Sequence, residues 1–167
     1  MKFRFSIIML FFIAQQAGAQ SQLTGYKDPA IPIVAEEGIG QISVSGNIDV
    51  VLIQGDEESV GVKISPESIR KIEFSIFSDH LYLSPSSAMQ ENERVKVYVS
   101  ISDLNKIRLE GNASAMSRNI LSAGNLRVFL GPHAKINLRT KQQIRVHSDS
   151  SYEVFEQKGY YGVYSKG

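Results

Sequence analysis

The stretch that decides the fold is "SVSGNIDVVLIQGDEESVGVKIS", residues 43–65, in which three short apolar runs are separated by two turn signals. Alternation with a period of two places Ile48, Val50 and Leu52 on one face of a strand. Val51 and Ile53 make the reverse face apolar as well. A strand that is apolar on both faces is covered on both sides, so we expect this one inside a sheet system. The stretch predicts an all-β domain with short strands and tight turns.

The N-terminus has the organisation of a secretory signal peptide. A positively charged start precedes an almost wholly apolar run over residues 5–14, and a small-residue cleavage signal ends at Ala19. The apolar run is shorter than the roughly 20 residues that span a bilayer. These features predict a signal peptide over residues 1–19, cleavage between Ala19 and Gln20, and export to the periplasm, the cell surface or the medium.

Composition limits what the remaining chain can be. Removing Lys2 and Arg4 with the signal peptide leaves 16 of the 18 basic residues against 17 acidic ones, a net charge of −1. The absence of cysteine excludes disulfides, zinc–thiolate sites and a thiol nucleophile. No later segment is apolar for long enough to cross a membrane. We expect a linker over residues 20–39, where prolines and glycines break any period, and a single domain over residues 40–167.

Three segments after Asp103 repeat one pattern. Each begins with an apolar–Arg–apolar triplet, at residues 107–109, 126–128 and 144–146, so the offsets are 19 and 18 residues. Each continues with turn-forming residues and a second short apolar pair. One coil of a β-solenoid needs such a period, because a coil buries little apolar surface alone and must stack on neighbours about 4.8 Å away. We predict a small single-stranded β-helix, or solenoid-like domain, with hairpins in a β-sandwich as the alternative.

The apolar strand predicted near residues 48–53 also belongs to a longer motif. A Gly-x-(Ile/Phe)-Asp-Val-x-Leu strand followed by a Gln-Gly-acidic turn is matched by Gly46, Ile48, Asp49, Val50, Leu52, Gln54, Gly55 and Asp56. A "Leu-Asn" corner at 104–105 and a "Gly-Asn-Ala-Ser" turn at 111–114 follow. Over about residues 40–155 the chain resembles the head GIN domain family of "putative auto-transporter adhesins". The resemblance implies an all-β, solenoid-like domain at the cell envelope and transfers no catalytic residue. The chain departs from the pattern in its few coils and in "GPHAKIN", which replaces a second small-residue turn.

The repeat alignment places Arg108, Arg127 and Arg145 at equivalent positions. In a solenoid they would stack on the outer face of adjacent coils, where like charges repel by roughly 0.6–0.8 kcal/mol per pair in water. A bound anion would relieve that repulsion. Residues 111–148 contain no acid, and Arg139 and Lys141 lie there with Arg127 and Arg145. We therefore predict Arg139, Lys141 and the three aligned arginines as ligand-binding. The alternative is that outward strand positions simply take long basic side chains, which protect sheet edges.

Other chemistry has less support in the sequence. The acidic turn at residues 56–58 could offer carboxylates to calcium, but adjacent residues do not all point at one centre, which favours a solvated turn. The three histidines have no metal-ligand spacing, and neither a nucleophile elbow nor a phosphate-binding loop is present. No known nucleic-acid-binding motif occurs either. We expect no cofactor and no catalysis.

The sequence therefore favours a non-enzymatic exported module that binds or adheres at the cell envelope, with an acidic glycan or another envelope polyanion as ligand. A structural or regulatory envelope domain that binds another protein is the first alternative. A polysaccharide-active enzyme is the remote one, for which the repeat region offers only Glu110, Asp149 and Glu153 as carboxylates. Homo-oligomerisation stays open.

Overall fold

The computed structural model describes residues 31–34, 38–55, 61–148 and 151–165. The predicted signal peptide with its cleavage at Ala19–Gln20, the acidic turn at 56–58 and Asp149 lie outside the described residues. Within them the chain is built almost entirely of β-strands, which confirms the all-β prediction. A 3-10 turn, η2 (Ile69–Lys71), is the described helical element. The described part of the chain holds no helix of a length and apolarity suited to a membrane span.

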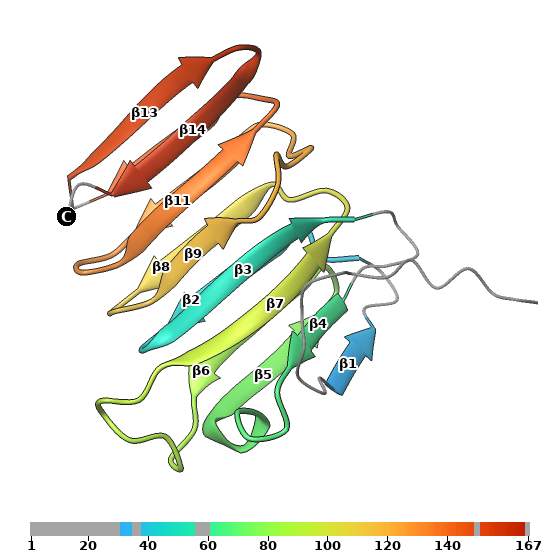
Figure 1. Ribbon diagram of the computed structural model, residues 1–167, viewed down its shortest axis with the longest axis vertical. Coiled ribbons are helices and arrows are strands. Elements are labelled where there is room, and N and C mark those ends of the chain that lie inside the picture. The colour runs from blue at the N-terminus through green and yellow to red at the C-terminus, as the bar shows by residue number, and fades with distance from the viewer. Residues whose placement is uncertain (1–30, 35–37, 56–60, 149–150, 166–167) are drawn as a thin grey trace, which may run out of the picture.

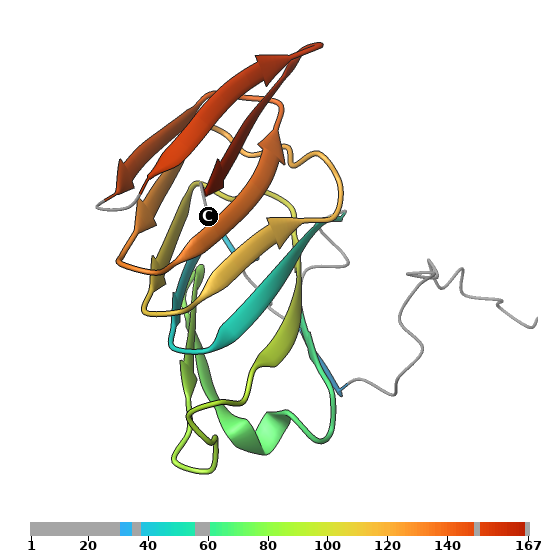
Figure 2. The same ribbon diagram turned by 60° about the vertical axis from the view of Figure 1, so that its left-hand side comes forward.

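Two open sheets face each other, as Figures 1 and 2 show. The larger sheet has the order β1 (Ile31–Val34), β4 (Gly61–Ile64), β7 (Val95–Ile101), β3 (Ile48–Gln54), β9 (Ser114–Ser117), β11 (Lys135–Thr140), β14 (Tyr160–Ser165) and β13 (Tyr152–Gln157). The smaller sheet has the order β12 (Ile144–Ser148), β10 (Leu126–Leu130), β8 (Lys106–Glu110), β2 (Gln41–Ser45), β6 (His80–Pro85) and β5 (Ile72–Phe77).

The chain alternates between the sheets in coils, each with one strand in the smaller sheet and one in the larger. The coils are β2–β3, β6–β7, β8–β9 and β10–β11, and neighbouring coils pair through parallel strands. Their spatial order differs from the chain order, because β2–β3 lies between β6–β7 and β8–β9. Antiparallel strands extend the larger sheet at both ends and the smaller sheet at its β5 end, whereas β12 at the other end pairs in parallel with β10. The architecture thus combines the parallel coils of a solenoid with the two packed sheets of a sandwich.

Strand register confirms part of the predicted repeat and corrects the rest. Strands β10 and β12 align at the expected offset of 18 residues, with Leu126 beside Ile144. Strands β8 and β10 align with Val128 beside Ile107, an offset of 21 residues instead of 19. A shift of two residues leaves every side chain on the same face, so the apolar pattern alone cannot separate these registers. The last repeat is also interrupted, because β14 lies between β11 and β13.

The core fills the space between the two sheets, and β3 lies at the centre of the larger one. Ile48, Val50 and Leu52 are fully buried in the core. Val51 and Ile53 face outward, yet each is only 7% exposed, as the doubly apolar pattern predicted. Burial of an aliphatic side chain of this size contributes about 1.5–3 kcal/mol. This strand and its neighbours β7 and β9 therefore anchor the domain.

One strand lies inside the segment that the sequence assigned to a linker, residues 20–39. Strand β1 pairs with β4 in antiparallel register, with Pro32 opposite Lys63. Proline gives no amide hydrogen to a ladder, so it is tolerated on an edge strand such as β1. The two prolines of the segment led the sequence reasoning to miss this strand.

The motif residues shared by β3 and the turn at 111–114 join neighbouring coils. The Asp49 carboxylate accepts hydrogen bonds from the Arg94 guanidinium and from the Ser114 hydroxyl, and Arg94 also donates to the carbonyl oxygen of Asn112 at 3.0 Å. The Asn112 amide donates in turn to Asn47 Oδ1 at 3.0 Å. These contacts connect three coils, so the motif has a structural role.

The second part of the motif, Gln54, fixes the opposite corner of the coils. Its side-chain amide nitrogen donates to the carbonyl oxygen of Ser102 at 2.8 Å, and its amide oxygen accepts from the backbone nitrogen of Ser122 at 2.7 Å. The backbone nitrogen of Gln54 donates to Asn119 Oδ1 at 2.8 Å. One glutamine at the end of β3 therefore holds the segments that follow β7 and β9.

Candidate functional site

The outer surface of the smaller sheet, which we call the small-sheet face, carries three rows of side chains across its strands. The rows exist because alternate residues of each strand point outward and parallel neighbours are in register. The basic row contains Lys106, Arg127 and Arg145, the ladder row contains Tyr82, Ser43, Arg108, Phe129 and His147, and the third row contains Ser84, Ser45 and Glu110.

The basic row sets three cations side by side on β8, β10 and β12. Lys106 lies beside Arg127, and Arg127 lies beside Arg145. Within the described ranges, none of the three forms an ion pair with a carboxylate. Neighbouring charges about 5 Å apart repel by roughly 0.8 kcal/mol in water. Arg127 and Arg145 are neighbours as the sequence predicted, but Lys106 occupies the position that the sequence assigned to Arg108, because of the two-residue shift in register.

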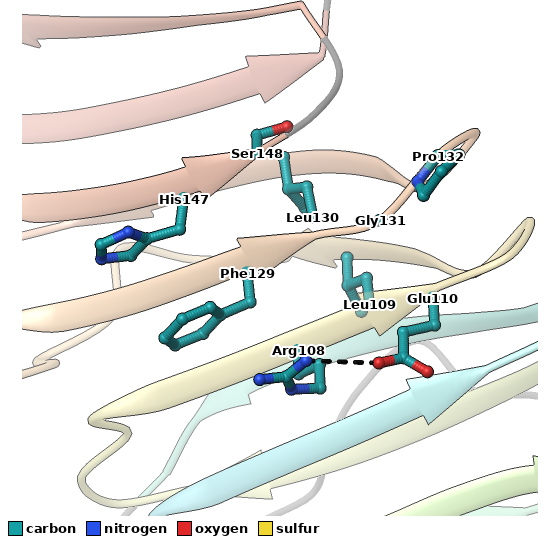
Figure 3. A pocket seen from close by; sticks show the side chains of 9 residues that line it. All are labelled: Arg108, Leu109, Glu110, Phe129, Leu130, Gly131, Pro132, His147 and Ser148. Atoms are coloured by element: carbon teal, nitrogen blue, oxygen red, sulfur yellow. Dashed lines mark hydrogen bonds and ion pairs between the residues drawn. The ribbon is translucent and has the colours of Figure 1, made fainter.

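Arg108 belongs instead to a stack that includes two rings, shown in Figure 3. Its guanidinium carbon lies 4.9 Å from the centroid of the Phe129 ring, at a distance that permits a cation–π contact worth about 0.5–1 kcal/mol. On the other side of Phe129, the His147 ring stacks at 4.9 Å with an interplanar angle of 12°. Both faces of Phe129 are thus covered, and ring edges are what this stack offers to a ligand.

A hollow of about 470 Å³ lies beside this stack. Arg108, Glu110, Phe129 and His147 contribute to its lining, and Gly131, which directly follows β10 and lies beside Glu110, has no side chain to fill the space. Arg108 Nη1 and Glu110 Oε1 form an ion pair at 3.3 Å, drawn as a dashed line in Figure 3. The hollow therefore combines a hydrogen-bond donor, an acceptor and ring edges, next to the cations of the basic row.

The five ligand-binding residues predicted from the sequence do not form one patch. Arg108, Arg127 and Arg145 share the small-sheet face. Arg139 lies on β11, where it pairs with Gly162 on the outer surface of the larger sheet, and Lys141 lies in the turn after β11. They separate because the chain alternates between the sheets, so residues that are close in sequence reach opposite surfaces.

The carboxylates considered for catalysis are also separated. Glu110 is on the small-sheet face, whereas Glu153 lies on β13 of the larger sheet beside Tyr164. A hydrogen bond to Glu153, together with burial, raises the pKa of the Tyr164 hydroxyl. Among the described residues, no three histidine, aspartate or glutamate side chains gather as metal ligands. Glu110 and Glu153, the two described candidates, thus lie on different sheets.

Sequence reasoning missed Lys106 and Phe129 and considered Glu110 only as a possible catalytic acid, although a signal for all three was present. In the strand at 106–110, lysine, arginine and glutamate alternate with isoleucine and leucine, so all three polar residues had to share the outward face. Phe129 occupies an outward position two residues after Arg127. What the sequence could not supply was the register that makes these residues neighbours.

Comparisons with known proteins agree with this architecture. A family model described as "Putative auto-transporter adhesin, head GIN domain" matches residues 40–159. The crystal structure of a putative adhesin from Bacteroides fragilis NCTC 9343 is similar, with 18% identity and a TM-score of 0.54 over 72% of this chain and 58% of that one. No curated protein matches the chain.

Two further solved structures are similar as well. A putative adhesin from Parabacteroides distasonis ATCC 8503 has 16% identity and a TM-score of 0.59 over 74% of this chain and 53% of that one. A putative adhesin from Parabacteroides merdae ATCC 43184 has 18% identity and a TM-score of 0.54 over 75% and 52%. The chain spans little more than half the length of these proteins. At such identities the likeness concerns the fold alone.

Proposed function

Because the chain belongs to the head GIN domain family of "putative auto-transporter adhesins", we propose that it is a non-enzymatic binding module of the cell envelope whose ligand is an acidic glycan. The observation that carries this proposal is the basic row. Lys106, Arg127 and Arg145 are aligned in register on one open face, and no described carboxylate pairs with them. An anionic ligand would remove their mutual repulsion.

The geometry favours a linear polymer over a small anion. The basic row crosses three strands and so extends for about 10 Å on an exposed surface. A polymer that carries an acidic group on successive units can contact all three cations at once, which a single small anion cannot do. The hollow beside the row supplies Arg108 and Glu110, a donor and an acceptor suited to sugar hydroxyls.

Polygalacturonate serves as the probe for this proposal. The Lys106→Gln/Arg127→Gln/Arg145→Gln variant loses the three charges of the basic row. The matched control, Lys63→Gln/Lys96→Gln/Lys135→Gln, loses three charges from the outer surface of the larger sheet. We expect the first variant to bind at least roughly tenfold more weakly than the parent, since the loss of about 1.4 kcal/mol is tenfold. The control should stay close to the parent.

Salt gives a second readout of the same interaction. Because exposed charges are screened over about 10 Å at 0.1 M salt, affinity of the parent should fall steeply between low and physiological ionic strength. An equal loss of affinity in both triple variants would indicate attraction to net charge alone and would contradict a site. Failure of the parent to bind the polymer would direct the search to a protein partner, recoverable by crosslinking.

The proposed function also requires that the protein is exported. We infer that residues 1–19 direct export, that the mature chain begins at Gln20, and that the binding domain starts near residue 40, where the family match begins. Mass spectrometry of the protein recovered from the producing cell tests this directly. A mature N-terminus at Gln20 is expected, and a chain that keeps Met1 inside the cell would contradict it.

A further inference from the structure

The small-sheet face has a second hollow, on the other side of the Arg108–Glu110 pair. It measures about 240 Å³ and is lined by Ser43, Ser45, Tyr82, Ser84, Arg108 and Glu110. It lies in the ladder row, where Ser43 pairs with Arg108 on one side and with Tyr82 on the other. The side chain between these two large groups is therefore one of the smallest in the row.

The spacing of the row shows what size of group this hollow accepts. Arg108 and Phe129 lie 4.9 Å apart, as do Phe129 and His147, because each comes from the next strand. Tyr82 and Arg108 come from strands that are two strand spacings, roughly 10 Å, apart, and only the small Ser43 side chain projects between them from β2. A six-membered ring that enters the hollow would therefore lie over Ser43, between the side chains of Tyr82 and Arg108.

Contacts on β6 keep Tyr82 at the side of the hollow. Its ring stacks on that of His80 with centroids 3.9 Å apart, and His80 Nε2 shares a hydrogen bond of 2.9 Å with the Ser43 hydroxyl. Tyr82 remains 44% exposed in this position. The His80 ring therefore covers one face of Tyr82, and the hydrogen bond fixes the hydroxyl of Ser43, which lines the hollow.

The lining has the chemistry that recognises a sugar. The hydroxyls of Ser45 and Ser84 can each donate and accept, the Glu110 carboxylate accepts, and the Arg108 guanidinium donates, while the Ser43 hydroxyl already bonds His80. Tyr82 adds an aromatic surface with a polar end. We propose that this hollow binds one sugar ring of the glycan, between Tyr82 and Arg108, and thereby distinguishes a polysaccharide from other polyanions. This inference rests on the proposed function, since the basic row supplies the remaining affinity.

The test fills the hollow from within. The Ser43→Phe variant places a ring between Tyr82 and Arg108, where Phe is well suited to an outward strand position. The matched control is Ser75→Phe, because Ser75 lies on the opposite side of Tyr82 in the same row. Polygalacturonate and poly-L-glutamate with equal numbers of carboxylates serve as probes. Thermal unfolding establishes that both variants are folded.

We expect the parent to bind polygalacturonate roughly tenfold more tightly than poly-L-glutamate, a difference of about 1.4 kcal/mol. Ser43→Phe should abolish this preference and leave the affinity for poly-L-glutamate unchanged, while Ser75→Phe should keep the preference. Glu110→Gln provides a second variant that does not fill the hollow. It removes an acceptor and a negative charge, so poly-L-glutamate should bind more tightly and the preference for the polysaccharide should shrink.

The outcomes separate the two proposals. If the parent binds both polymers equally, or Ser43→Phe keeps the preference, the sugar-binding hollow is wrong, and the basic row stands provided that its triple variant loses affinity for both polymers. Loss of the preference in Ser75→Phe as well would also overturn the hollow. If the parent binds neither polymer, both proposals fail together.

Discussion

The hydroxyl of Ser114 donates a hydrogen bond to the carboxylate of Asp49, directly across the parallel strands β9 and β3 of neighbouring coils. The Arg94 guanidinium donates to the same carboxylate, with Nε 3.1 Å from Oδ2. Burial by itself raises the pKa of Asp49, but the hydrogen bonds from Arg94 and Ser114 outweigh it and lower the pKa overall. Asp49 therefore links neighbouring coils most strongly in its ionised form.

We expect Asp49→Asn to destabilise the protein by about 1–3 kcal/mol at pH 7, since it removes a charged acceptor from two donors. The lowered folded-state pKa stabilises the parent above the unfolded-state value, near pH 4, and this contribution is lost as the pH falls through the folded-state pKa. Urea unfolding from pH 7 to pH 3 should thus show a difference in the free energy of unfolding between parent and variant that narrows below about pH 4. The exposed control Glu91→Gln should track the parent, and a gap that does not narrow would contradict the account.

Gln54 should be among the most sensitive polar residues of the domain. Replacement by alanine removes the hydrogen bonds to Ser102 and Ser122, which join the end of β3 to two later segments. Because the Ser102 carbonyl left behind is partly buried whereas Ser122 is exposed, we expect a loss of about 1–2 kcal/mol in the free energy of unfolding. Gln143→Ala, on an exposed turn residue, is the control and should change stability by no more than about 0.5 kcal/mol. Urea denaturation measures both, and equal effects would argue against the corner joint.

The C-terminal hairpin depends on the absence of a side chain at Gly162. Phe155 is its partner on β13, and a Cβ at position 162 would come within 2.1 Å of the Phe155 ring. Gly162→Ala should therefore cost about 1–3 kcal/mol by overpacking. The Phe155→Ala/Gly162→Ala double variant tests the cause, because the methyl group then has room. Thermal unfolding of the two single variants and the double variant should show a coupling of at least about 0.5 kcal/mol, and simple additivity would contradict it.

Gly46, between β2 and β3, and Gly111, after β8, allow the cost of backbone strain to be compared with the cost of steric overlap. Gly46 and Gly111 have φ of 72° and 63°, in the left-handed region that costs a residue with a side chain roughly 1–2 kcal/mol. A Cβ at Gly46 would also lie 2.5 Å from Pro85, whereas at Gly111 the nearest atom would be 3.5 Å away. We expect Gly46→Ala to destabilise by about 1–2 kcal/mol more than Gly111→Ala. Equal losses in urea denaturation would show that Pro85 moves aside freely.

The sequence was informative wherever a signal was local. The apolar residues on both faces of β3 predicted its central place, and the similar apolar–Arg–Val triplets at 126–128 and 144–146 predicted the pairing of β10 with β12. The pairing of β8 with β10 was beyond such reasoning, since a two-residue shift keeps the inward face apolar. Arg108 consequently lies next to Phe129 and Lys106 next to Arg127.

The site was only partly predictable for the same physical reason. Outward positions have no requirement for apolarity, so nothing in the pattern indicates which outward side chains of different strands meet. The stack of Arg108, Phe129 and His147 and the hollow over Ser43 depend on that cross-strand register. The insertion of β14 before β13 also escaped, because an antiparallel return at the last coil resembles another repeat when read along the chain.

The placement of the first coil between the second and the third limits how such a chain can grow. In a simple array, duplication of one unit at either terminus lengthens the molecule without disturbing the others. Here β2 and β3 each pair on both sides with strands that follow them in the sequence. An extra coil inserted beside this first coil would therefore separate β2 and β3 from strands with which they pair. A nascent chain also cannot enclose its first coil until Ser117 at the end of β9 has been synthesised. Variation in length is thereby directed toward the C-terminal end.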